Sequence, residues 1–94
     1  MTDDSELHRL REEITETDRT ILDAVNARIE LVARIKAHKE THGIAFLDPE
    51  RERTMLDDLT RENHGPLSTE GLRELFGTIL DLSKREVAGD GRPG

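Results

Sequence analysis

The sequence predicts an all-α protein with three helices, one long and two shorter, and no strands. Three observations support this fold class. Residues 7–41 contain neither Pro nor Gly, the two residues that most reliably interrupt a helix. Two later segments each begin with a good helix cap, Asp48 and Ser68, and continue with apolar residues at helical spacing. The remaining apolar stretch, residues 43–48, is short and has no partner strand, so we interpret it as a packed connection.

The long helix is defined by an apolar stripe. Its members recur at steps of three and four, which places them on one side of a helix: Leu7, Leu10, Ile14, Ile21, Ala24, Leu31 and Ile35. His38 and Lys39 lie near the expected end, and Gly43 can adopt the left-handed conformation of a C-cap. About 35 residues span roughly 50 Å as a helix, whereas a compact domain of this size has a radius of gyration of about 12 Å. A second chain is therefore expected to cover the stripe, most simply in a two-fold dimer.

The second and third helices are each predicted from their starting signals. Asp48 caps the second helix, Pro49 takes its first position, and the helix runs to about Glu62. Ser68 caps the third helix, whose broad apolar face continues to Val87.

The chain forms a single domain, residues 1–94, with a core of about residues 6–87. Residues 1–5 are expected to be a loose leader, in which Asp3, Asp4 or Ser5 caps the long helix. Residues 88–94 are expected to be a flexible tail.

Composition excludes several classes of partner. The 94 residues include 14 Lys and Arg against 21 Asp and Glu, a net charge of −7, which argues against nucleic acid or an anionic membrane as a partner. No apolar run approaches the roughly 20 residues of a membrane span, and the acidic N-terminus does not look like a signal peptide. The chain has no Cys, which fits a reducing cytoplasm. No metal, thiol or phosphate-loop motif is present, so we expect no metal and no cofactor.

A set of cations on the long helix indicates a binding site. Arg28 falls on the apolar stripe, where a bare guanidinium needs a partner or an anion. Lys39, eleven residues later, differs from it by only about 20° around the helix. Arg11 is turned about 100° away from Arg28, so it cannot easily face the same pocket in its own subunit. In an antiparallel dimer it could reach the partner's pocket.

The second and third helices add polar groups to this set. Asp48, Arg51 and Glu52 lie at the start of the second helix, and Ser83 lies on the apolar face of the third. Alone, each charged residue is more often an ordinary ion-pair residue, and Ser83 more often bonds back to the preceding turn. Together they indicate a helix-enclosed pocket for a small dianion, because Arg binds carboxylates bidentately and Lys supplies a point charge.

Several segments also match a known family. LREEI (10–14), Asp18, Arg28, RIKAHK (34–39), LDPERE (47–52), ENHGPLS (62–68) and Ser83 resemble the all-helical chorismate mutases. The resemblance covers about residues 7–85. It implies an intertwined homodimer with two equivalent active sites that act on the dianion chorismate, with no cofactor, in phenylalanine and tyrosine biosynthesis.

The resemblance also implies roles for individual residues. Arg11 from the opposite subunit and Arg28 would hold the substrate carboxylates, and Arg51 would add a positioning contact. Lys39 would donate to the ether oxygen. Asp48, largely through its backbone, and Glu52 would bind the ring hydroxyl. Ser83 would bind a carboxylate.

One position departs from the family pattern. Val87 stands where the family usually has Gln or Glu, which contacts the same ether oxygen as Lys39. Either the helix end shifts to bring Glu86 inward, or Lys39 works alone.

The reaction would be a one-step rearrangement of chorismate to prephenate, which needs no nucleophile and no acid–base pair. The sequence leaves two other enzymes of the same fold open, an isochorismate-pyruvate lyase and an aminodeoxychorismate mutase. It also leaves open a non-catalytic helical dimerisation or regulatory module that binds an upstream shikimate-pathway enzyme.

Overall fold

The computed structural model describes residues 2–88, with side chains from residue 4 onward. It contains three helices: α1 (Thr2–Thr41), α2 (Pro49–Glu62) and α3 (Thr69–Ala88). No strand occurs among the described residues, and residues 43–48 form an irregular connection. The predicted all-α class and the three helices are therefore confirmed.

Both chain ends differ from the prediction in detail. α1 begins at Thr2, so residues 2–5 continue the helix and the predicted loose leader with a cap at residues 3–5 is wrong. The physical reason is that these residues contain no helix breaker, and acidic side chains are favourable in the first turn of a helix. At the other end α3 includes Ala88, and the rest of the predicted tail lies outside the described residues.

The caps that begin α2 and α3 are where the sequence predicts them. The Arg51 N–H donates to Asp48 Oδ1 at 3.1 Å, and Pro49 follows as the first residue of α2. The Gly71 N–H donates to Ser68 Oγ at 2.9 Å, which caps α3. Each cap satisfies a backbone donor that would otherwise have no partner at the helix start.

Gly43 ends α1 and directs the chain into the connection. Its φ is 66°, in the left-handed region that favours glycine. The Ile44 N–H donates to the Lys39 carbonyl at 2.8 Å, and the Gly43 N–H donates to the Glu40 carbonyl at 3.4 Å. These two bonds are the usual pair of a glycine C-cap. The turn brings the connection back beside the last turns of α1.

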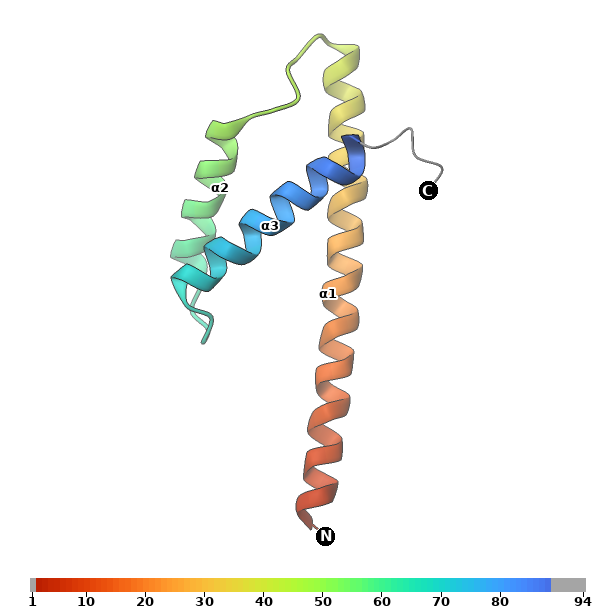
Figure 1. The fold of residues 1–94 in the computed structure, drawn as a ribbon, viewed down its shortest axis with the longest axis vertical. Coiled ribbons are helices and arrows are strands. Elements are labelled where there is room, and N and C mark those ends of the chain that lie inside the picture. The colour runs from red at the N-terminus through yellow and green to blue at the C-terminus, as the bar shows by residue number, and fades with distance from the viewer. Residues whose placement is uncertain (1, 89–94) are drawn as a thin grey trace.

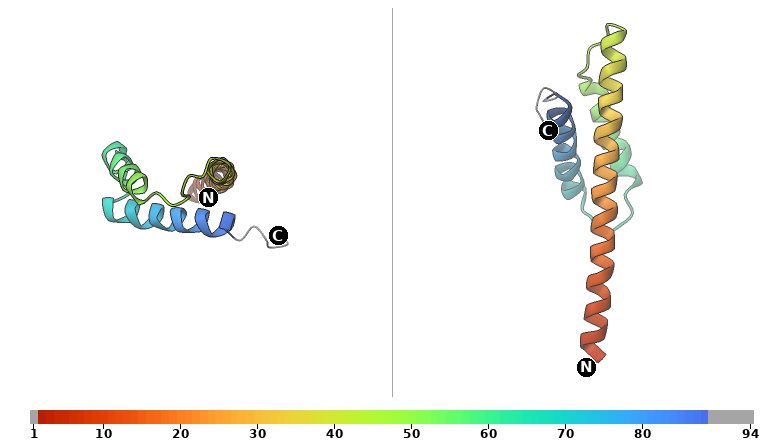
Figure 2. Two further views of the ribbon diagram at one scale, coloured as in Figure 1. Left: turned by 90° about the horizontal axis from the view of Figure 1, so that it is seen from above. Right: turned by 90° about the vertical axis from the view of Figure 1, so that its right-hand side faces the viewer.

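The arrangement of the helices is open. α3 packs against both α1 and α2, and seen from above it runs from one to the other (Figure 2). The N-terminal half of α1 extends well past the other two helices (Figure 1). The extents are 62 × 35 × 15 Å and the radius of gyration is 17.6 Å, against the 12 Å or so of a compact chain of this length. No described helix has both the length and the apolar character needed to cross a membrane.

The core of a single chain is small and lies on α3. Leu72, Leu80 and Val87 are its buried apolar residues, and Ser83 is buried with them. The stripe on α1 is largely uncovered: six of its members are between 43% and 60% exposed, namely Leu7, Leu10, Ile14, Ile21, Leu31 and Ile35. One chain alone therefore leaves most of its apolar stripe in water.

Two glycine substitutions should shift stability in opposite directions. A Cβ at Gly43 or at Gly77 would meet no atom within 4 Å, so neither substitution causes a clash. Gly43→Ala forces alanine into the left-handed region and should lower the free energy of unfolding by about 1 kcal/mol. Gly77→Ala lies inside α3 and should raise it by about 0.5–1 kcal/mol. Urea unfolding of both variants checks the pair, and a stabilising Gly43→Ala would contradict the cap.

Candidate active site

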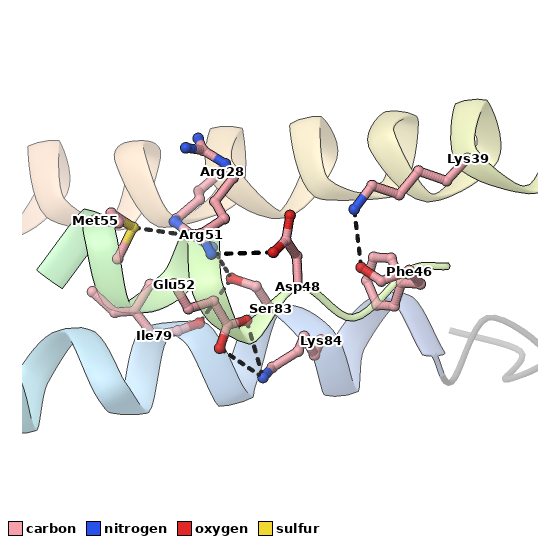
Figure 3. Close-up of polar contacts among 10 residues, drawn as sticks. All are labelled: Arg28, Lys39, Phe46, Asp48, Arg51, Glu52, Met55, Ile79, Ser83 and Lys84. Carbon is pink, nitrogen blue, oxygen red and sulfur yellow. Dashed lines mark hydrogen bonds and ion pairs between the residues drawn. The ribbon is translucent and has the colours of Figure 1, made fainter. Parts of the chain in front are cut away.

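One pocket between the three helices collects most of the residues that the sequence singles out. Figure 3 shows their side chains converging from α1, α2 and α3. Its volume is about 130 Å³, and it is lined by Arg28, Val32, Ile35, Lys39, Phe46, Asp48, Arg51, Glu52, Met55, Leu80, Ser83 and Lys84. Ligand pockets usually measure about 300–1,000 Å³. The pocket of one chain is thus small for an organic substrate and open on one side.

Arg28 is the group that joins all three helices at this pocket. It is half-buried on α1, and its Nη1 donates to Ser83 Oγ on α3 at 2.8 Å. Its Nη2 lies 3.8 Å from Met55 Sδ on α2. Ser83 Oγ also donates to the Ile79 carbonyl at 2.8 Å, so its bond back to the preceding turn coexists with its contact to Arg28. The guanidinium is held in one position with donors left for a ligand.

Lys39 lines the same pocket about three turns further along α1, on the same face as Arg28. It is half-buried, and its Nζ donates to the Phe46 carbonyl in the connection at 3.1 Å. The glycine turn at Gly43 brings that carbonyl back to the helix. A neutral carbonyl orients the ammonium without cancelling its charge, so the charge remains available to an anion.

The start of α2 contributes the next polar groups. Asp48 uses its Oδ1 for the cap, while Arg51 and Glu52 follow in the first turn of the helix. Arg51 and Asp48 are exposed and Glu52 is half-buried. Because Asp48 fixes the start of α2, the cap determines the direction in which the side chains of Arg51 and Glu52 point.

Three cations of the pocket have no carboxylate partner within the described part of the chain: Arg28, Lys39 and Arg51. Outside the pocket, cations such as Arg9 and Arg19 pair with glutamates one turn away. The lining as a whole contains four cations and two carboxylates, hence two net positive charges. The full chain carries a charge of −7. A dianion is the complementary ligand for such a pocket.

Two predicted site residues lie elsewhere in this chain. Arg11 is exposed in the N-terminal half of α1 and does not line the pocket. Val87 is 6% exposed and borders a separate hollow together with Ile29 and Ala33 of α1. Val87, at the position where the family usually has Gln or Glu, therefore does not line this pocket, because its side chain is buried where α3 lies against α1. Glu86 borders the same separate hollow and does not line the pocket of this chain either.

Lys84 also lines the pocket, although it was not among the residues predicted from the sequence. Its Nζ lies 3.1 Å from Glu52 Oε2 and 3.3 Å from Glu52 Oε1, in an ion pair between α3 and α2. Helical spacing contains a signal for it, since Lys84 follows the buried Leu80 by four residues and therefore lies on the same side of α3. Its partner could not be read from the sequence, because that depends on how α2 and α3 pack.

No arrangement of metal ligands accompanies this site in the described residues. Nowhere between residues 4 and 88 do three His, Asp or Glu side chains gather in a way that could hold a metal ion. The stacked rings of His38 and His42, with centroids 4.2 Å apart, lie near the end of α1 outside the pocket.

Comparison with known proteins gives consistent results. Residues 10–87 match the family model for chorismate mutase type II. The 4-amino-4-deoxychorismate mutase of Streptomyces venezuelae is 38% identical over 82 residues, which cover 85% of this chain and 79% of that protein. The T-protein of Enterobacter agglomerans is 38% identical over 58 residues, 62% of this chain but only 16% of that protein.

Solved structures agree with the sequence comparisons. A chorismate mutase of Thermus thermophilus, in its form I structure, superposes with a TM-score of 0.81 at 37% identity, covering 83% of this chain and 98% of that chain. The form II structure gives a TM-score of 0.80 at the same identity, covering 83% of this chain and 89% of that chain.

Removal of the Ser83 hydroxyl should destabilise the chain through Arg28. Ser83 is 2% exposed and accepts the Arg28 bond, so Ser83→Ala leaves a half-buried guanidinium without that acceptor. We expect the free energy of unfolding to fall by about 1–2 kcal/mol, measured by urea unfolding.

Thr78→Ala is the matched control for Ser83→Ala. Thr78 is exposed on α3 and makes the same bond back to the preceding turn, Oγ1 to the Glu74 carbonyl at 3.0 Å. We expect this variant to change stability by less than about 0.5 kcal/mol. Equal losses in the two variants would show that the contact with Arg28 contributes nothing.

Proposed function

The chain belongs to the chorismate mutase type II family, and we propose that it rearranges chorismate to prephenate in a pocket that two chains complete. The observation that carries the proposal is the set of cations without carboxylate partners, Arg28, Lys39 and Arg51, around one pocket of an otherwise acidic protein. Chorismate carries two carboxylates, which matches the two net positive charges of the lining.

The chemistry of this reaction fits the groups that are present. The breaking ether C–O bond and the forming C–C bond change together within one molecule, so no atom, proton or electron is exchanged with the protein. The enzyme has to hold the flexible dianion in the folded, reactive conformation and stabilise the negative charge that grows on the ether oxygen. Both tasks call for fixed cations and for no nucleophile or base.

We assign the two tasks to different cations. Arg28, fixed by Ser83 and Met55, binds a substrate carboxylate, and Arg51 lies beside it at the start of α2. Lys39, whose charge is not balanced by a carboxylate, meets the ether oxygen. Fixed donors of this kind contribute about 3 kcal/mol each to the stabilisation of a transition state.

The acidic end of the pocket binds the hydroxyl group on the substrate ring. Glu52 accepts the hydrogen bond of the ring hydroxyl, and the backbone at Asp48 adds a polar contact beside it. Because Val87 is packed against α1, no side chain from that position assists Lys39.

We further propose that the working enzyme is a homodimer with shared active sites. The exposed stripe on α1 supplies the apolar surface for the contact, since its members are 43% to 60% exposed in one chain. The small open pocket of about 130 Å³ leaves a side for the partner to close. Arg11, far from the pocket of its own chain, then enters the pocket of the other.

A direct assay tests the function. Purified protein is incubated with chorismate, and both the ultraviolet loss of chorismate and the formation of prephenate are followed. Well-folded protein that gives only the uncatalysed rate would exclude the proposal. The same protein is also assayed with isochorismate and 4-amino-4-deoxychorismate.

The comparison with a relative favours 4-amino-4-deoxychorismate as a second candidate substrate. The Streptomyces venezuelae relative, at 38% identity over 82 residues, is a 4-amino-4-deoxychorismate mutase. A higher kcat/KM for the amino compound than for chorismate would assign this chain to that activity instead.

Substitution of Lys39 tests the electrostatic role. Lys39→Ala should lower kcat/KM for chorismate by about 10²-fold or more, because the charge on the ether oxygen is no longer stabilised. Arg34→Ala is the control, since Arg34 is exposed on the same helix and outside the pocket. An unchanged kcat/KM in Lys39→Ala would show that Lys39 does not stabilise the charge on the ether oxygen.

Subunit complementation tests the shared site. Arg11→Ala and Lys39→Ala are each expected to be inactive alone. Unfolded together and refolded in equal amounts, they should form heterodimers in which one of the two sites has both groups, and recover about a quarter of wild-type activity. No recovery would mean that Arg11 acts in its own subunit or not at all. Arg11→Ala that is fully active alone would also contradict the shared site.

A further inference from the structure

The ion pair between Lys84 and Glu52 stands out within the pocket. It is the one ion pair formed between two pocket-lining residues in the described chain, and it joins α3 to α2 (Figure 3). The two side chains are 30% and 29% exposed, so the pair faces the pocket and is partly shielded from water. An ion pair in such a place acts on whatever ligand lies next to it.

We propose that Lys84 determines which ring substituent the pocket accepts, favouring a neutral hydroxyl over a cationic amine. Lys84 acts through Glu52 and is therefore a positioning residue. The inference rests on the proposed function, in which Glu52 receives the ring hydroxyl.

Glu52 can accept hydrogen bonds from Lys84 and from a ring hydroxyl at the same time. An ionised carboxylate has two oxygens with about four acceptor positions. The Lys84 ammonium takes up part of this capacity from the α3 side, at 3.1 and 3.3 Å. The remaining positions accept a hydroxyl hydrogen, and the ammonium keeps the carboxylate in one orientation.

The charge of Lys84 distinguishes an amine from a hydroxyl at the ring position bound by Glu52. An amine in place of the ring hydroxyl is largely protonated at neutral pH, as the lysine amine is. Bound at Glu52, it would bring a second ammonium next to that of Lys84, and like charges so placed repel strongly. A hydroxyl meets no such repulsion. The pair therefore disfavours the amino compound more than the hydroxyl compound.

The net charge of the pocket lining also depends on Lys84. With Lys84 the pocket has four cations and two carboxylates, and without it the excess falls to one positive charge. Glu52 would then be an uncompensated anion beside a dianionic substrate. Such an anion favours a ligand that brings its own positive charge. Removal of the Lys84 charge should therefore weaken the binding of chorismate. It should strengthen the binding of 4-amino-4-deoxychorismate relative to that of chorismate.

Substitution of Lys84 provides the test. Lys84→Met keeps the length and loses the charge, and Lys84→Gln is a second uncharged variant in case the first folds poorly. Lys84→Arg keeps the charge. Arg85→Met is the matched control, because Arg85 is the next residue on α3, is exposed and lies outside the pocket. For each protein, kcat/KM is measured with chorismate and with 4-amino-4-deoxychorismate.

The readout is the ratio of the two values of kcat/KM. The uncharged variants should move this ratio toward the amino compound by about tenfold or more. Lys84→Arg should retain the wild-type preference, and Arg85→Met should leave it unchanged. Binding of both compounds is also measured by calorimetry in the Lys39→Ala background, where conversion should be slowed by about 10²-fold or more.

The outcomes separate this inference from the proposed function. An active enzyme whose ratio is the same with and without the Lys84 charge overturns the inference and leaves the function standing. A shift that Arg85→Met reproduces also overturns it. If neither compound is converted but the Lys84 charge still changes their relative binding, the proposed function is wrong and the inference holds.

Discussion

The arrangement of the three helices depends on Arg28, whose guanidinium lies in the apolar stripe of α1 without a carboxylate partner among the described residues. A half-buried Arg is stable only when its donors are used. Arg28 directs one donor to Ser83 of α3 and another to Met55 of α2, so the same two contacts that orient the side chain also link the three helices, and further donors remain for a ligand. The positive charge itself stays unbalanced. The packing of the three helices and the proposed affinity for an anion thus both depend on the surroundings of Arg28.

The long helix explains why one chain is not enough. A helix of 40 residues cannot be covered by the 34 residues of α2 and α3 when only its C-terminal half has neighbours. The uncovered half bears both apolar residues and Arg11. In the proposed dimer the same contact that removes the stripe from water brings another cation to a pocket that is open on one side. Stability and catalysis would then depend on the same interface.

Local signals in the sequence were sufficient for most of the fold. The caps at Asp48 and Ser68 and the turn at Gly43 involve residues within five positions of one another, so their chemistry is visible in the sequence. The shared face of Arg28 and Lys39 follows from helical periodicity alone. Contacts between helices were not visible. The pairing of Lys84 and the position of Val87 beside α1, outside the pocket, both depend on the angle at which α3 crosses its neighbours, and that angle is decided by packing.

The placement of Val87 changes how α3 should be understood. Its apolar face serves two purposes along one helix: Val87 packs onto α1, while Ser83 and Lys84 line the pocket. Successive turns of a helix can be divided in this way because residues four apart share a face but lie a full turn apart along the axis. A polar side chain at position 87 would have to give up the packing on α1 in order to reach a ligand. In this chain the polar groups that α3 brings to the pocket therefore come from the preceding turn, and in the proposed site Lys84 acts on the ring through Glu52 of α2.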